Sequence, residues 1–382
     1  MPIMLAFIIV AVSVIAITYK TYMGYGDYGL TAKIGFFLFL VLGWSAPFIG
    51  FALRHNDPNG GLIYLTKALY FLFGFVFFLF VITILRDTLW VIIDLIRRVP
   101  VEEMKNPPLL KKINIITVVF CVFVCVYAAY EAEKAAAVKT YDIISPKIKE
   151  ETKVVMMSDL HIDVDMKPER VKSIVDRVNA LNPDVIVLVG DIVDNTSKNL
   201  YKQMEELKNF KAKYGTYITL GNHEFYIGAM EWGMKFASIG LNFLNNYGAK
   251  VGTTGVFIAG IPDINAALGY KMPVKIENAL YNAEKEDYVI LLSHAPKILE
   301  EMPKDKIDLM LSGHTHGGQI FPFHYFVEQA NDGILAGFYN RNGINMYVSR
   351  GTRYWGPPMR LFAPSEITVF NLKPQKNADN AQ

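Results

Sequence analysis

The sequence predicts an α/β domain that follows a region of apolar helices. Two observations support this organisation. Most of the apolar excess lies before about residue 131, where four long apolar runs occur. After that point, short runs rich in β-branched residues alternate with helical patterns, which is typical of buried strands in an α/β fold. The chain of 382 residues is long enough for more than one folding unit.

Each apolar run is close to the length of about 20 residues with which a helix crosses a bilayer. The runs cover residues 3–18, 34–53, 62–85 and 113–130. Core helices of a soluble domain would carry polar stripes at helical spacing, and such stripes are nearly absent. A signal peptide would begin with basic residues, but neither Lys nor Arg precedes Lys20, so we expect a retained first helix. Residues 1–130 are therefore predicted to form a multi-pass transmembrane domain of about four helices.

Basic residues predict the orientation of these helices. The segment between the third and fourth runs carries Arg86, Arg97, Arg98, Lys105, Lys111 and Lys112. The positive-inside rule places this segment in the cytoplasm, so the part of the chain after the fourth run is expected to be extracytoplasmic. Lys134, Lys139 and Lys147 follow the fourth run and oppose this orientation. Residues 89–96 fit either a helix on the membrane surface or a continuation of the third helix.

A charged segment at residues 131–152, whose first half favours a helix, is interpreted as a linker. It leads to a folded domain at residues 153–373, and a polar tail follows at residues 374–382. The two cysteines, Cys121 and Cys125, lie outside the folded domain, which excludes a disulfide framework and thiolate chemistry there. The net charge of +2 gives no reason to expect nucleic acid as a partner.

Polar residues follow five of the six strands that we expect in the folded domain. The expected strands are residues 154–157, 185–189, 217–220, 256–259, 289–292 and 309–311. The residues after them are Asp159, His161, Asp191, Asp194, Asn222, His223, Glu224, His294, His314 and His316. Ligand sites in α/β sheets form at the carboxyl ends of strands, so these side chains are expected to meet. We interpret Asp194 as a loop-capping carboxylate and Glu224 as a residue that orients a neighbour.

Imidazole and carboxylate groups in this number indicate divalent metal ions such as Mn, Fe or Zn. Two ions about 3.5–4 Å apart can hold the attacking and leaving oxygens of a displacement at phosphorus. A carboxylate can bridge two ions, whereas a neutral imidazole cannot. The glycines beside the last histidine pair, Gly313, Gly317 and Gly318, are expected where backbones approach closely or φ is positive.

The order of these motifs is similar to that of the calcineurin-like metallophosphoesterase superfamily. The motifs are Asp-x-His at 159–161, Gly-Asp-x-x-Asp at 190–194, Gly-Asn-His-Glu at 221–224, the single His294, and Gly-His-x-His at 313–316. The resemblance implies a four-layer α/β/β/α sandwich at residues 153–373 and a metal-dependent phosphoric ester hydrolase.

The resemblance also implies the role of each site residue. Asp159, His161 and His316 would hold one divalent ion, Asn222, His294 and His314 would hold the other, and Asp191 would bridge both. A water shared by the ions would lose its proton and attack phosphorus as hydroxide. His223 has no ligand position in this scheme and resembles the catalytic histidine, which stabilises the transition state or protonates the leaving oxygen.

The expected substrate is a phosphodiester or a pyrophosphate, and a lipid-linked compound is one candidate. Residues 348–372 are similar to the closing segment of a membrane-associated bacterial branch, which includes hydrolases acting on UDP-diacylglucosamine. Asn195 and Thr196 stand where protein serine/threonine phosphatases carry Arg and Gly, which disfavours a phosphoprotein. A nucleotide or a cell-wall polymer is an alternative substrate.

Two other classes of function are weaker alternatives. A non-catalytic metal-binding scaffold should have lost a ligand or His223, and none is lost. A sensor or transport unit would need polar groups in its helices, where Lys67 is the main one. Five aromatic residues fit either an acyl-facing rim or ordinary packing: Phe321, Phe323, Phe326, Tyr354 and Trp355.

Overall fold

The computed structural model describes residues 2–24, 27–57, 59–99, 107–300 and 302–375. The chain divides into two compact units. One unit contains the apolar helices together with the short segment Gly356–Met359, and the other contains both β-sheets.

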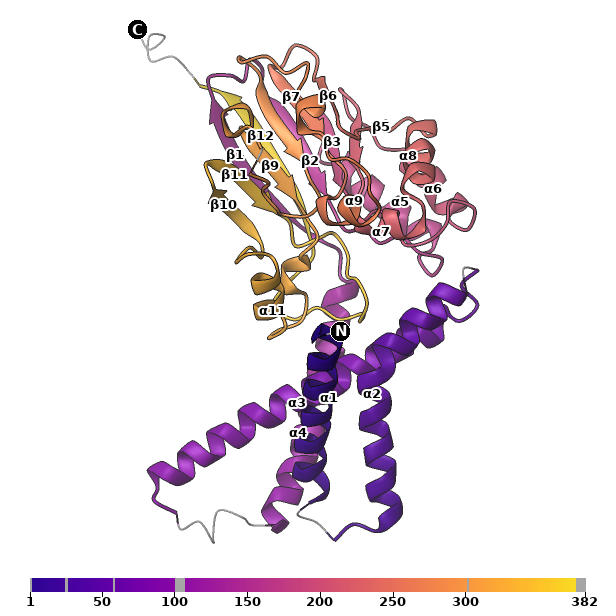
Figure 1. Ribbon diagram of the computed structural model, residues 1–382, viewed down its shortest axis with the longest axis vertical. Coiled ribbons are helices and arrows are strands. Elements are labelled where there is room, and N and C mark those ends of the chain that lie inside the picture. The colour runs from indigo at the N-terminus through magenta and orange to yellow at the C-terminus, as the bar shows by residue number, and fades with distance from the viewer. Residues whose placement is uncertain (1, 25–26, 58, 100–106, 301, 376–382) are drawn as a thin grey trace. The chain divides into compact units, whose positions relative to one another are not determined.

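The first unit is built from four apolar helices (Figure 1): α1 (Pro2–Met23), α2 (Leu30–Asn56), α3 (Ile63–Ile96) and α4 (Pro107–Glu133). In the part of the chain that the structure describes, three segments are long and apolar enough to cross a membrane, namely Leu30–Arg54, Ile63–Ile96 and Pro108–Glu133. Within the described residues, Ile8–Met23 of α1 forms a shorter apolar helix.

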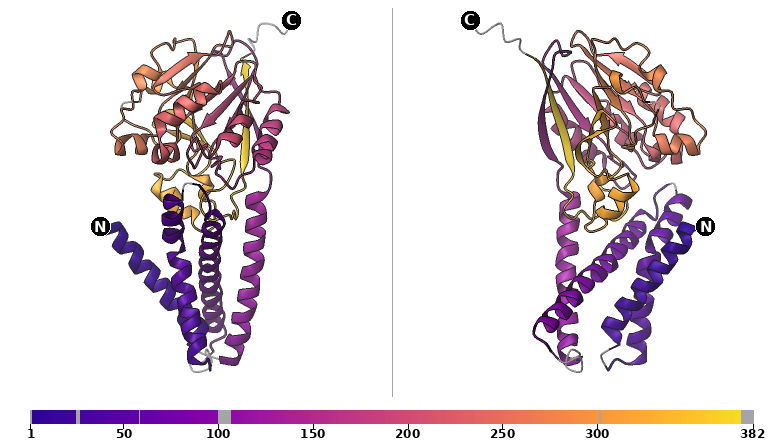
Figure 2. Two further views of the ribbon diagram at one scale, coloured as in Figure 1. Left: turned by 90° about the vertical axis from the view of Figure 1, so that its right-hand side faces the viewer. Right: turned by 60° about the vertical axis from the view of Figure 1, so that its left-hand side comes forward.

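The third helix settles one of the alternatives that the sequence leaves open. Figure 2 shows α3 as one continuous helix, so residues 89–96 prolong it. The charge pattern places Arg86 in the segment that connects the third and fourth helices, and this prediction is wrong. Arg86 lies inside α3. Its guanidinium donates to Asn114 Oδ1 at 2.8 Å and to Thr117 Oγ1 at 2.9 Å, both on α4. Lys105 lies outside the described residues.

The second unit contains two six-stranded sheets. The first has the order β1-β12-β2-β3-β4-β5, formed by Ala137–Ser145, Glu366–Pro374, Thr152–Met157, Val185–Val189, Thr216–Thr219 and Asn242–Phe243. The second has the order β10-β11-β9-β8-β7-β6, formed by Gly337–Arg341, Ile344–Val348, Leu309–Ser312, Tyr288–Leu292, Val256–Gly260 and Tyr247–Lys250. The six predicted strands correspond to β2, β3, β4, β7, β8 and β9.

The two sheets pack face to face and helices cover their outer faces (Figure 1), which confirms the predicted four-layer sandwich. Side chains such as Val187 on β3 and Ile290 on β8 form the core between the sheets. The other face of the first sheet packs mainly on α5 (Pro168–Asn179), α6 (Tyr201–Leu207), α7 (Asn222–Ile227) and α8 (Ala229–Ser238). The outer face of the second sheet packs on α9 (Ile264–Gly269) and α10 (Ile276–Ala279).

The segment expected to be a linker, residues 131–152, contributes a strand instead. After α4 ends at Glu133, β1 pairs in parallel with β12 from Ala137↔Glu366 to Ser145↔Pro374. One of the charged residues that favour a linker interpretation forms an ion pair with β12: Lys139 Nζ lies 2.9 Å from Glu366 Oε2. The aromatic and β-branched residues between them favour the extended conformation.

Candidate active site

The predicted site residues meet at one edge of the two sheets. Asp159 and His161 follow β2, Asp191 follows β3, and Asn222 and His223 begin α7 directly after β4. The other three, His294, His314 and His316, follow β8 and β9. Among the described residues, three groups each contain donor atoms that lie within 4.8 Å of one another: first Asp159, His161 and His316; second Asp191, His294 and His314; and third His161, Asp194 and His223.

The backbone is left-handed at five of these residues. The φ angles are 54° at Asp159, 44° at His161, 52° at Asp191, 71° at His314 and 51° at His316. Such angles cost non-glycine residues about 1–3 kcal/mol each and cluster at functional sites. Each angle turns the chain sharply after a strand and directs the side chain toward the common site.

Glycines allow the strand-end loops to approach one another. A Cβ at Gly190, where φ is 73°, would lie 2.5 Å from His294 Nδ1. A Cβ at Gly313 would overlap the carboxylate of Asp159. A side chain at either position would therefore push apart the loops that carry the site, as predicted for Gly313.

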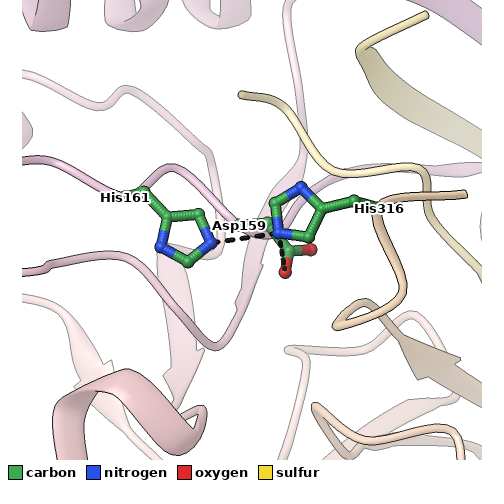
Figure 3. Close-up of side chains that lie close together, drawn as sticks. All are labelled: Asp159, His161 and His316. Atoms are coloured by element: carbon green, nitrogen blue, oxygen red, sulfur yellow. Dashed lines mark hydrogen bonds and ion pairs between the residues drawn. The ribbon is translucent and has the colours of Figure 1, made fainter. Parts of the chain in front are cut away.

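The first group contains two imidazoles whose Nε2 atoms face each other (Figure 3). His161 Nε2 lies 3.1 Å from His316 Nε2, which lies 3.3 Å from Asp159 Oδ1. His161 Nδ1 donates to Asp194 Oδ1 at 2.9 Å, and His316 Nδ1 donates to the Arg353 carbonyl at 3.1 Å. A carboxylate and a carbonyl can only accept, so these contacts favour a proton on Nδ1 of each ring, although Arg360 Nη2 also lies 3.2 Å from His316 Nδ1. With that tautomer, both Nε2 atoms direct lone pairs toward the site. A cation between them would remove their repulsion.

The second group contains the fully buried His294, whose Nε2 lies beside the carboxylate of Asp191. His294 Nδ1 donates to the Val189 carbonyl at 2.8 Å, so Nε2 is the nitrogen that faces the site, 3.1 Å from Asp191 Oδ2. The same Asp191 oxygen lies 3.9 Å from His161 Nε2 in the first group. Asp191 is therefore the carboxylate that stands between the two groups.

Asn222 joins the second group through its amide oxygen. Its Oδ1 lies 2.9 Å from His314 Nδ1, while its Nδ2 donates to the Tyr226 hydroxyl at 3.3 Å. The tyrosine thus orients the amide so that the oxygen faces the site.

Burial and neighbouring charges set the protonation of the site. Burial and the adjacent His161 hold the pKa of His316 well below its ordinary value, and burial together with His294 lowers the pKa of His314. Burial alone would raise the pKa of Asp191, but His294 and His223 hold it below its ordinary value. Burial alone would lower the pKa of His294, but Asp191 and Asp159 raise it well above its ordinary value. A metal ion would take the place of the His294 proton, because neutral imidazoles and ionised carboxylates are the forms that bind metal ions.

Asp194 has a larger part in the site than the interpretation as a loop cap allows. Its Oδ1 accepts a hydrogen bond from His223 Nδ1 at 2.6 Å as well as from His161 Nδ1. His223 Nε2 is left pointing toward Asp191 Oδ2, 3.8 Å away. The only signal for this role in the sequence is the position of Asp194 in the same loop as Asp191.

Glu224 connects two of the strand-end loops. Its fully buried carboxylate accepts from the backbone N–H groups of Asp191, Ile192, Val193 and Gly221, at 2.6–3.1 Å. Burial and the nearby Asp191 raise the pKa of Glu224 to about 7. Glu224 therefore holds backbone groups of two loops, in line with its interpretation as an orienting residue.

The chain is similar to known metallophosphoesterases in sequence. Residues 152–318 match the calcineurin-like phosphoesterase family. An uncharacterized metallophosphoesterase of Campylobacter jejuni is 36% identical over 267 residues, which cover 68% of this chain and 69% of that protein. The chain belongs to the calcineurin-like metallophosphoesterases. A transmembrane protein with metallophosphoesterase domain from Danio rerio is 33% identical over 276 residues, covering 68% of this chain and 62% of that protein. An uncharacterized metallophosphoesterase of Aquifex aeolicus is 33% identical, and the match covers 63% of this chain and 93% of its own length.

Membership of this family confirms the predicted resemblance and enzyme class: the chain has a phosphoesterase hydrolase domain preceded by apolar helices. The family implies divalent metal ions, and the residues present fit them. The donor set suits divalent cations: it consists of His294 Nε2, the facing Nε2 atoms of His161 and His316, and the ionised Asp191.

Proposed function

We propose that this protein is a membrane-embedded phosphoesterase that uses two divalent ions to hydrolyse a phosphodiester or a pyrophosphate. The observation that carries this proposal is the position of Asp191 between two groups of donor atoms, 3.1 Å from His294 Nε2 and 3.9 Å from His161 Nε2. Two neighbouring ions can share one carboxylate ligand, and Asp191 is the carboxylate that lies between the two sets of imidazole donors.

In this proposal Asp159, His161 and His316 hold one ion, Asn222, His294 and His314 hold the other, and Asp191 binds both. Mn, Fe and Zn all suit these ligands. When bound, the ions would supply a nucleophile at neutral pH and stabilise the charge on the phosphoryl group.

His223 is the proposed catalytic residue. Its Nδ1–H is held by Asp194, so a proton on Nε2 can be donated to the leaving oxygen or can stabilise charge on the phosphoryl group. The backbone N–H of His223 donates to Asp191 Oδ1 at 2.9 Å, which holds the histidine beside the bridging carboxylate. Asp194 keeps the ring in one tautomer and orientation.

The apolar helices support membrane embedding. Their outward side chains include Phe51, Leu95 and Phe123, each more than 60% exposed, and such a surface is stable only in lipid. We propose four membrane spans, with α1 as the first. The basic residues at Arg97, Arg98, Lys111 and Lys112 support a cytoplasmic α3–α4 connection and an extracytoplasmic catalytic domain.

Membrane attachment favours a lipid-linked phosphodiester or pyrophosphate as substrate, with a nucleotide or a cell-wall polymer as the alternative. Nucleic acid is not an expected partner. Among the aromatic residues considered for an acyl-facing rim, Tyr354 is buried and its hydroxyl donates to Glu133 Oε1 at 2.9 Å, so it serves packing. Phe323, Phe326 and Trp355 are exposed.

The proposed function is tested with the purified full-length chain in detergent and Mn²⁺. We expect it to cleave bis(para-nitrophenyl) phosphate faster than para-nitrophenyl phosphate, and to lose this activity after treatment with a chelator. Asp191→Asn removes the bridging carboxylate and should be inactive, while Asp176→Asn on the exposed face of α5 is the matched control. Failure of the folded, metal-loaded chain to cleave either ester, in detergent and in lipid, would favour the scaffold alternative.

A further inference from the structure

Two exposed aromatic side chains stand beside the proposed catalytic histidine. The ring centroid of Trp355 lies 5.7 Å from that of His223 at an interplanar angle of 85°, and that of Tyr226 lies 5.5 Å away at 53°. His223 itself is largely covered, with 14% of its side chain exposed. Trp355 is 46% exposed and Tyr226 is 60% exposed. Both therefore keep ring surface open to a molecule that approaches His223.

The backbone of Trp355 is held in place by a buried glutamine. Gln319 Oε1 accepts from the Trp355 N–H at 2.9 Å, and Gln319 Nε2 donates to the Trp355 carbonyl at 2.8 Å. Gln319 is buried, with 9% exposure, and has a left-handed backbone with φ of 49°. Strained backbone and a pair of reciprocal hydrogen bonds fix the position of an exposed tryptophan.

A buried arginine ties the same loop to a proposed metal ligand. Arg360 is fully buried, and its Nη2 donates to the carbonyls of Arg350 at 2.8 Å and Arg353 at 2.6 Å. Its Nη1 donates to the carbonyl of His316 at 3.2 Å. The loop that carries Trp355 is therefore anchored to the metal-ligand loop, so Trp355 is held in a defined position relative to the site.

We propose that Trp355 and Tyr226 form the subsite for the leaving group of the substrate, and that this group presents a flat, apolar ring face. The proposal rests on the proposed function, in which His223 donates to the leaving oxygen. Because the two rings flank His223, the group bonded to that oxygen would lie against them. Ring-on-ring packing contributes to binding without a specific hydrogen bond, and holding the rings in place beforehand reduces the entropy lost on binding.

The test compares two diesters that share a methyl group and differ in the leaving group: para-nitrophenyl methyl phosphate, with a flat ring, and trifluoroethyl methyl phosphate, with none. The readout is the ratio of their kcat/KM values in the full-length, Mn²⁺-loaded protein. The different intrinsic reactivities of the esters cancel when variant and wild type are compared. Trp355→Ala should reduce the ratio about tenfold through a higher KM for the ring ester, and Trp355→Phe should restore most of it.

The matched control is Tyr281→Ala, another exposed aromatic residue, at 84% exposure, which should leave the ratio unchanged. An unchanged ratio in Trp355→Ala, or an equal loss with both esters, would overturn the subsite while leaving the proposed function intact. Cleavage of neither ester by the wild type would instead overturn the proposed function, and the subsite with it.

Discussion

At the scale of single residues, the site depends on hydrogen bonds that decide which nitrogen of each imidazole is available. His161, His294 and His316 each donate from Nδ1 to a carboxylate or carbonyl oxygen, so each directs Nε2 toward the proposed ions. Such partners of metal ligands commonly matter almost as much as the ligands. Asp194 is notable among them because it serves both a proposed ligand and the proposed catalytic histidine.

Asp194→Asn is predicted to lower kcat about a hundredfold, because a neutral amide holds the required tautomer and orientation of His223 less well than a carboxylate does. Asp194 also orients the proposed ligand His161, so kcat is measured at saturating Mn²⁺, where a weaker metal affinity does not contribute. The measurement is kcat alongside the metal content of the purified protein. A variant with wild-type kcat would contradict the role assigned to Asp194.

Glu224→Gln is predicted to reduce the stability of the catalytic domain by about 3 kcal/mol. The carboxylate accepts four backbone N–H bonds, and the amide group of glutamine would place donors against some of them. The check is the midpoint of thermal denaturation for the wild type and the variant. Glu231→Gln, on the exposed face at the start of α8, is the control and should shift the midpoint little. A midpoint equal to that of the wild type would show that the Glu224 carboxylate is dispensable for holding the loops.

At the scale of elements, β1 belongs to the catalytic domain and not to a linker. The Tyr141 ring lies 4.9 Å from that of Phe338 and 5.4 Å from that of Tyr347, both on the second sheet. Glu366, at the start of β12, is fully buried and lies near Lys139 of β1. Removal of β1 would expose these side chains and leave the buried carboxylate without one of its cationic partners.

We therefore predict that a fragment starting at residue 134 folds, while one starting at residue 153 does not. The first retains the parallel pairing of β1 with β12, and the second presents β12 as a new edge strand. Soluble yield and a cooperative thermal transition distinguish the two fragments. Equal stability would return the domain boundary to residue 153.

At the scale of the whole molecule, the helices and the phosphoesterase domain differ in how much apolar surface they expose. The helices expose apolar side chains that need lipid, whereas the sandwich buries its apolar residues in its own cores. The protein is expected to stay in the membrane fraction after alkaline carbonate extraction. Release into the soluble fraction would contradict membrane embedding.

The orientation of the chain is predicted from charge alone. A reporter fused after Gln382 should be active on the extracytoplasmic side, because the α3–α4 connection is flanked by basic residues. Arg86 no longer supports this orientation, since it is bonded to α4 within the helical unit. A fusion active only in the cytoplasm would reverse the orientation and leave the proposed chemistry unaffected.

Local patterns in the sequence predict the order of the molecule: apolar helices, then an α/β sandwich, with Asp159, His161, Asp191 and the later histidines after strands. Periodicity and strand-end position are local properties, and each can be identified from neighbouring residues. Which side chains share a partner is known only from the packing of the folded chain. The bonds of Asp194 to two imidazoles, of Glu224 to two loops and of β1 to β12 join residues distant in sequence. Residue type does not predict such partners, because they depend on how the loops and sheets pack.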